Sequence, residues 1–156
     1  MKTLITIVLI ALIPLSIFSQ SDAIDDFYYS HGLADNMLKF NIGNSLIRMG
    51  SWFIEEPATK NLVRKSKRAR ILLSDGEHPV TRREIDRLVR EISHDGYESL
   101  ALVRDGLQKI EVYVREDKSY IRNLLVVVHG DDEFLMASLD CKFTMDEVEA
   151  AFNEEL

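Results

Sequence analysis

The pattern of apolar and polar positions between Tyr97 and Cys141 predicts four consecutive antiparallel strands. In the second of them, Leu107–Arg115, successive side chains point to opposite sides of the strand. One side carries Ile110, Val112 and Val114, and the other carries Glu111, Tyr113 and Arg115. We expect the apolar side to pack on the core and the charged side to face water or a partner.

Short turns join these strands. Asp105-Gly106 favours a type I′ turn, because Asp and Gly tolerate positive φ values. Gly130-Asp131 predicts a second two-residue turn, with glycine first as type II′ prefers. Between them, Leu124–Val128 is apolar without alternation, which indicates a central strand covered on both sides. The strand Phe134–Leu139 completes a four-stranded meander.

Upstream of the meander the pattern predicts four helices and two strands. In chain order they are a helix over Ser21–Gly32, a strand over Met37–Gly43, a helix from about Asn44, a helix from Pro57, a strand over Ala69–Ser74 and a helix after Pro79. The last has the clearest signals, since Thr81 and Glu84 form a capping box and Gly96 stands where the helix would end.

Two of the predicted helices, the one from about Asn44 and one at the C-terminus, carry apolar residues at helical spacing. The helix from about Asn44 holds Leu46, Ile47, Met49, Trp52 and Phe53, and we expect this set to fill the core. The alternative to core packing is that Trp52 and Phe53 line a groove. The C-terminal helix starts with a capping box at Thr144–Glu147 and docks by Val148, Ala151 and Phe152.

Together these elements predict a single α+β domain over residues 20–156. An antiparallel sheet of about five or six strands, including the C-terminal four-stranded meander, carries helices packed mainly on one face.

The N-terminal segment, residues 1–19, predicts a secretory signal peptide, because Lys2 precedes an apolar run that Pro14 interrupts and Ser19 ends. An uncleaved anchor is the alternative. After cleavage no transmembrane span is expected. The signal peptide indicates export to the periplasm or outer envelope.

The excess of acidic residues makes polyanionic partners less favourable. The 156 residues include 26 Asp and Glu against 19 Lys and Arg, so nucleic acid and anionic membrane are not the default partners. Cys141 is the only cysteine, so no internal disulfide forms and stability comes from burial and hydrogen bonding.

Five motifs stand out along the chain, and they are Phe27–Ser30, Asn41–Gly43, Gly96–Leu100, Arg115–Lys118 and Leu124–Val128 followed by Gly130–Phe134. They resemble those of an exported bacterial family known as domain of unknown function 4252. His129 stands where the family pattern has a further glycine. The resemblance implies an envelope protein of Gram-negative bacteria, sometimes lipid-anchored, encoded near genes of extracytoplasmic sigma factors, and it implies no known activity.

The candidate chemistry is sparse. Asp131, Asp132 and Glu133 with His129 could ligate a cation if they converged, but a solvated turn is the favoured interpretation. His31, His78 and His94 are expected to be exposed imidazoles without metal-ligand spacing. Cys141 is expected to be a buried small side chain. We assign no catalytic, cofactor-binding or metal-binding residue and expect no cofactor.

The run Lys60–Arg70 holds six bases and no acid. One hypothesis is a docking patch for an acidic partner or for lipopolysaccharide phosphate, with Arg64, Lys67 and Arg68 as the candidate partner-binding residues. The alternative is a solvated helix end whose bases favour the helix dipole. We favour a non-enzymatic binding or regulatory module with another envelope protein as its partner. The alternative is a small metal-dependent hydrolase with a site near Gly130-Asp131.

Overall fold

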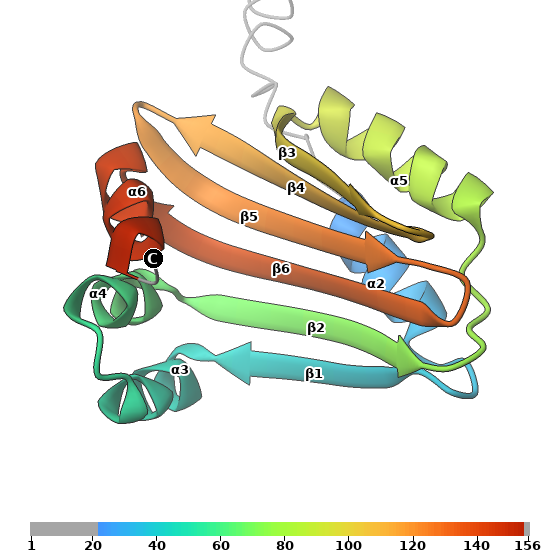
Figure 1. The fold of residues 1–156 in the computed structure, drawn as a ribbon, viewed down its shortest axis with the longest axis horizontal. Helices are drawn as coiled ribbons and strands as arrows, with labels where there is room; N and C mark the ends of the chain where they lie inside the picture. Colours follow the sequence, from blue (N-terminus) through green and yellow to red (C-terminus); the bar gives the residue numbers. More distant parts are fainter. Residues whose placement is uncertain (1–21, 155–156) are drawn as a thin grey trace, which may run out of the picture.

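The computed structural model describes residues 22–154, which form a six-stranded antiparallel sheet with helices (Figure 1). The strands are β1 (Leu38–Gly43), β2 (Arg68–Asp75), β3 (Tyr97–Asp105), β4 (Gln108–Asp117), β5 (Tyr120–His129) and β6 (Glu133–Phe143). They lie in the order β1-β2-β6-β5-β4-β3. The predicted α+β class and the meander β3-β4-β5-β6 are confirmed.

The predicted signal peptide, residues 1–19, lies outside the described residues. Within residues 22–154 no helix is both long and apolar enough to cross a membrane.

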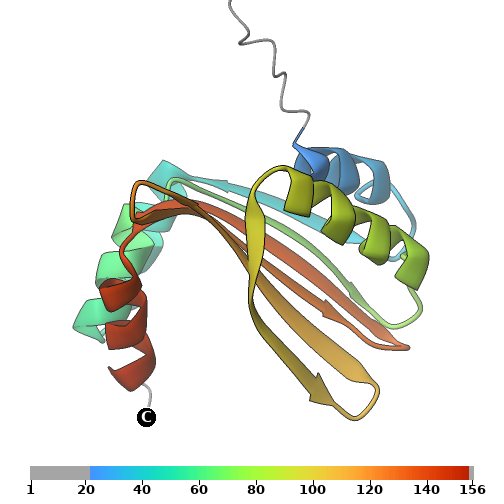
Figure 2. The same cartoon turned by 90° about the horizontal axis from the view of Figure 1, so that it is seen from above.

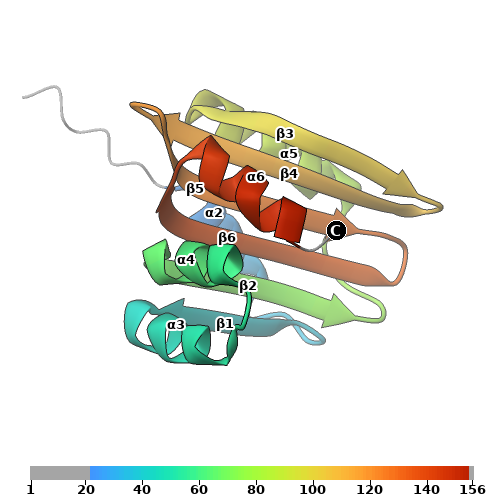
Figure 3. The ribbon, with the colours of Figure 1, turned by 60° about the vertical axis from the view of Figure 1, so that its left-hand side comes forward.

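The helices divide between the two faces of the sheet, whereas the sequence pattern predicted them mainly on one face (Figure 2). They are α2 (Ala23–His31), α3 (Asn44–Gly50), which continues as the 3-10 turn η1 (Ser51–Phe53), α4 (Pro57–Lys65), α5 (Arg82–His94) and α6 (Met145–Glu154). Seen from above, the sheet arches, with α2 and α5 on its outer side (Figure 2). The helices α3, α4 and α6 gather at one end of the inner side (Figures 2 and 3).

The main core lies on the outer side of the arch. We call this side the covered face and define it by Tyr113, Leu125 and Met136. Onto it pack Ala23, Ile24, Phe27 and Tyr28 of α2 and Ile85, Leu88 and Ile92 of α5, all buried in one cluster with those strand residues. This face therefore contributes most of the apolar burial that stabilises the fold.

The capping signals of α5 are confirmed. The Thr81 hydroxyl accepts from the Glu84 backbone N–H, and the Glu84 carboxylate accepts from the Thr81 N–H at 2.8 Å. The Thr81 backbone N–H lowers the pKa of Glu84 most, and the Thr81 hydroxyl, which donates to the same carboxylate at 2.8 Å, lowers it further. Gly96, just beyond the helix, has φ +87°, the left-handed conformation that ends many helices.

The assignment of faces in β4 was wrong. Glu111 and Tyr113, expected toward water, are buried on the covered face, whereas Ile110 and Val112 are only half-buried. Lys109 Nζ lies 2.7 Å from Glu111 Oε1, and the Tyr113 hydroxyl donates to the same oxygen at 3.0 Å. These contacts compensate the buried carboxylate, so a charged residue occupies a core position.

The turn types also differ from the prediction. Asp105 pairs with Gln108, so the β3–β4 turn centres on Gly106-Leu107, with positive φ at Gly106 but not at Leu107. The Gly130 N–H donates to the Glu133 carbonyl at 2.9 Å, so the β5–β6 turn centres on Asp131-Asp132, and Gly130 lacks positive φ. Each turn is shifted by one residue from its predicted position, and neither has the predicted type.

The helix after Asn44 is not a core element. Of its five large apolar residues only Ile47 is buried, and Leu46, Met49, Trp52 and Phe53 are exposed. The reason is topological, since α3 follows β1, which is an edge strand, and therefore lies away from the covered face. Leu38 and Phe40 of β1 are exposed as well.

Candidate functional site

The inner side of the arch is apolar across the whole sheet. We call it the open face and define it by Ile110, Val112 and Val126. Paired residues of antiparallel strands share a face, so the register assigns complete rows to it. One row is Phe40, Ile71, Ala137, Val126, Val112 and Ala101, and the next is Leu38, Leu73, Leu135, Val128, Ile110 and Val103. Most of these side chains are half-buried or exposed.

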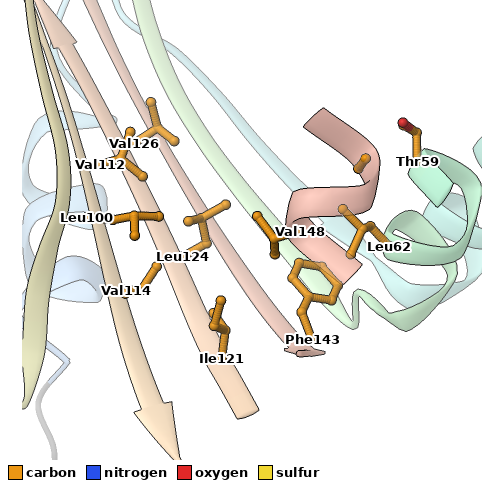
Figure 4. A pocket seen from close by; sticks show the side chains of 11 residues that line it. Thr59, Leu62, Leu100, Val112, Val114, Ile121, Leu124, Val126, Phe143 and Val148 are labelled. Atoms are coloured by element: carbon orange, nitrogen blue, oxygen red, sulfur yellow. The ribbon is translucent and has the colours of Figure 1, made fainter. Parts of the chain in front are cut away.

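A cavity of about 320 Å³ lies where this open face meets α4 and α6. Its sheet side is lined by Leu100, Val112, Val114, Ile121, Leu124, Val126 and Phe143, and its helix side by Thr59, Leu62, Val148 and Ala151. Figure 4 shows the side chains of Val112 and Leu124 on one side of this space and those of Leu62 and Val148 on the other. A β-bulge at Ser99/Ala101 lies beside Leu100, which also lines the cavity.

Polar contacts between α4 and α6 hold together the helical wall of the cavity. Glu147 of α6 contacts Lys65 of α4, and Asn61 Nδ2 donates to the same carboxylate at 3.1 Å. The Thr144 N–H also donates to Glu147, at 3.0 Å, as the predicted capping box requires. The Lys65 hydrogen bond and then the Thr144 backbone lower the pKa of Glu147 to about 2, so this carboxylate is charged at neutral pH.

The lining limits what the cavity can bind. Of the eleven described residues that line it, Thr59 alone has a polar side chain. A bound polar group would lose its hydrogen bonds to water without replacement, at a cost of roughly 1–3 kcal/mol each. The site therefore suits a hydrocarbon group.

A family model described as Domain of unknown function (DUF4252) matches residues 28–151. The chain belongs to this family. The resemblance that the sequence motifs indicated is confirmed. No curated protein and no solved structure matches the chain. The DUF4252 match includes all six strands of the described sheet and most of both helices that wall the cavity.

The basic run of this DUF4252 chain does not form one patch. Arg64 and Lys67 are exposed, whereas the Arg68 guanidinium is held by Asp140, with Nε 2.9 Å from Oδ2. Lys65 is engaged by Glu147. The structure thus leaves Arg64 and Lys67 available to a partner, and Arg68 only if its ion pair opens.

Arg70, the last base of that run, is a structural residue. Its side chain is 1% exposed and contacts Asp25 of α2. Its Nη2 lies 3.5 Å from Asp22 Oδ2 and 3.6 Å from Asp140 Oδ1. One guanidinium thereby joins the N-terminal end of α2 to strands β2 and β6. A sequence pattern cannot find this cluster, because its members are far apart in the chain.

The hairpin acids and His129 do not converge. Asp131, Asp132 and Glu133 are exposed at the turn, whereas His129 is buried on the covered face with Tyr113. Burial first, then the nearby Arg82, lowers the pKa of His129. No group of three or more potential metal ligands is found among the residues whose side chains the structure describes.

Two of the three remaining histidines are not the exposed side chains that we expected. The His31 ring stacks on Phe27, and its Nε2 lies 3.1 Å from Glu84, which links α2 to α5. His78 Nε2 lies 3.3 Å from the Gly130 carbonyl. Both are half-buried, and His94 is exposed as expected.

Cys141 is buried, as expected. Its thiol lies 3.5 Å from the Ile121 carbonyl, and burial raises its pKa to about 12. The thiol therefore stays protonated and unreactive at neutral pH.

Proposed function

We propose that this protein is an exported, non-enzymatic binding protein of the cell envelope, and that its ligand is a single acyl chain held in the cavity between the open face, α4 and α6. The observation that carries the proposal is the apolar cavity on an already apolar sheet face. The export signal expected in residues 1–19 supports the envelope as the place of action.

The shape of the site favours a slender ligand over a flat one. The open face is the inner side of an arch, and α4 and α6 stand over one end of it (Figure 2). A flat protein surface cannot reach the floor formed by Val112, Leu124 and Val126, whereas a hydrocarbon chain can lie between the sheet and the helices. The volume is within the range of small-molecule sites, roughly 300–1,000 Å³.

The free energy gained by burying an acyl chain in this cavity can be estimated from the number of buried methylenes. Each buried methylene contributes about 0.8 kcal/mol, so eight methylenes would contribute roughly 6 kcal/mol before association costs. Without those association costs the estimate corresponds to a dissociation constant between about 1 µM and 1 mM, which is the upper limit of the affinity from eight methylenes.

The test is a fluorescence titration of the full chain with cis-parinaric acid, a fatty acid whose emission rises when its chain leaves water. Val126→Phe places a ring in the cavity and should weaken binding about tenfold. Val128→Phe is the matched control, since Val128 lies on the same strand and face but not in the cavity lining, and should change binding less than about twofold. No emission change with the unaltered chain, or equal weakening by both variants, would contradict the proposal.

A further inference from the structure

The corner formed by α3 and η1 presents apolar side chains to solvent. We call Leu46, Met49, Trp52 and Phe53 the aromatic tip. Trp52 is 76% exposed and Phe53 is 87% exposed. Clustered exposure of large apolar residues on a folded chain marks an interaction site, whereas single exposed residues need no explanation.

The charge around this tip is opposite in sign to that of the chain. Arg48 lies within α3, and Lys60, Arg64 and Lys67 lie on or just after α4, which packs beside α3 and η1 (Figure 3). None of these four bases forms an ion pair with another residue in 22–154. Within residues 44–67 these four bases and Lys65 outnumber the two acids, Glu55 and Glu56, so this segment is net basic on a chain of net charge −7.

We infer that the aromatic tip docks this protein on an anionic lipid surface, with Trp52 and Phe53 at the level of the headgroups and the surrounding bases near lipid phosphates. Tryptophan is enriched at the membrane interface, and clustered Lys and Arg are attracted to anionic leaflets. Net acidity disfavours such a surface for the chain as a whole. It therefore orients the molecule, since this basic corner is attracted to the surface while the rest is repelled.

The geometry of the tip favours a lipid surface over a protein groove. Trp52 and Phe53 belong to a three-residue turn at a corner, and both project into solvent. Such a projection can enter the interfacial region of a bilayer, where amphipathic elements insert roughly 5–10 Å. The inference uses none of the cavity side chains and stands independently of the acyl-chain proposal.

Trp52 makes the test direct, because it is the only tryptophan in the chain. The full chain is mixed with vesicles of phosphatidylcholine alone or with phosphatidylglycerol added. We expect Trp52 emission to shift to shorter wavelength with the anionic vesicles, to be quenched by brominated lipid, and to respond weakly to the neutral ones. The signal reports the position of Trp52 itself, so attachment through residues 1–19 alone would leave it unchanged.

Three variants test which side chains contribute to vesicle binding. Arg64→Glu with Lys67→Glu should weaken vesicle partitioning at least about twentyfold, since each base contributes roughly fivefold. Phe53→Ser should weaken it about tenfold. Leu107→Ser is the control, because Leu107 is 81% exposed at the β3–β4 turn, the opposite end of the sheet, and should have no effect (Figure 1).

Three outcomes would overturn the inference. They are unchanged Trp52 emission with anionic vesicles, an equal shift with neutral vesicles, and a concentration-dependent shift without vesicles. The last would assign the tip to contact between copies of the chain.

Discussion

Replacement of Arg70 by methionine should release α2 from the sheet. The guanidinium is 1% exposed and contacts three carboxylates, those of Asp22, Asp25 and Asp140. Methionine retains a similar apolar stem but leaves these acids without their shared cation. Two of them, Asp22 and Asp25, lie at the start of α2, so the loss falls on the attachment of this helix.

The expected loss in the free energy of unfolding follows from the burial of the Arg70 side chain. Removing one partner of a buried ion pair costs about 3–5 kcal/mol. The three carboxylates are 24% to 35% exposed and can regain water, so we expect the lower limit, about 3 kcal/mol. For a domain of this size the urea m-value is about 2 kcal/mol/M, so the unfolding midpoint should fall by about 1.5 M.

The assay is equilibrium urea unfolding at pH 7, with Arg68→Met as the matched control. Arg68 makes one ion pair, to Asp140, with a side chain that is 44% exposed, so its removal should cost less than about 1 kcal/mol. Adding Asp25→Asn to Arg70→Met removes one unpaired charge and should restore roughly 1 kcal/mol. Equal losses from Arg70→Met and Arg68→Met would refute this role of Arg70.

Three more predictions concern the charge of Glu147, the burial of the two sheet faces and the reactivity of Cys141. Glu147 has a pKa of about 2 because Lys65 and Thr144 hold it charged, so its stabilisation is complete above about pH 4.5 and lost as pH falls toward 2. Glu147→Gln should therefore cost about 1 kcal/mol in urea unfolding at pH 6 and less at pH 3, while a pH-independent loss would contradict this. Leu125→Ala on the covered face should cost about 3 kcal/mol and Leu135→Ala on the open face less than about 1.5 kcal/mol, and equal costs would show that the faces are misassigned. Cys141 should react with a disulfide reagent at pH 8 only as the chain unfolds, so rapid labelling of the native protein would contradict its burial.

Local signals predicted the elements that depend on neighbouring residues. The capping box of Thr81 and Glu84 requires only a span of four positions, and Gly96 ends the same helix by its own φ. The strands of the meander likewise follow from alternation within about ten residues. These features could be predicted because the sequence separation between the interacting groups is small.

The burial of each face could not be predicted in the same way. Glu111 looked solvent-exposed because its partners, Lys109 and Tyr113, do not by themselves show which face the helices cover. Trp52 looked buried because an apolar helix usually packs on a core, and only the edge position of β1 places it outside. Both depend on contacts between distant segments, which hydrophobic periodicity does not encode.

The candidate site was missed for the same reason. The uninterrupted apolar run Leu124–Val128 predicted a central strand covered on both sides. The strand β5 is central, but the side chains of this run on the open face are only half-buried. However, the pattern cannot show that α4 and α6 cover one end of the second face and leave a cavity there. That arrangement requires β2 to insert between β1 and β6, which no local signal specifies.

The most direct test of the central claim is an NMR measurement of contacts between a bound fatty acid and the methyl groups of the protein. The full chain with labelled valine and leucine methyls is mixed with an unlabelled saturated fatty acid below its micelle concentration. The account predicts intermolecular NOEs from the acyl chain to Val112, Leu124 and Val148, which line the cavity, and none to Leu125 and Val127 on the covered face. Contacts to the covered face, or no contacts to the cavity residues at saturation, would contradict it.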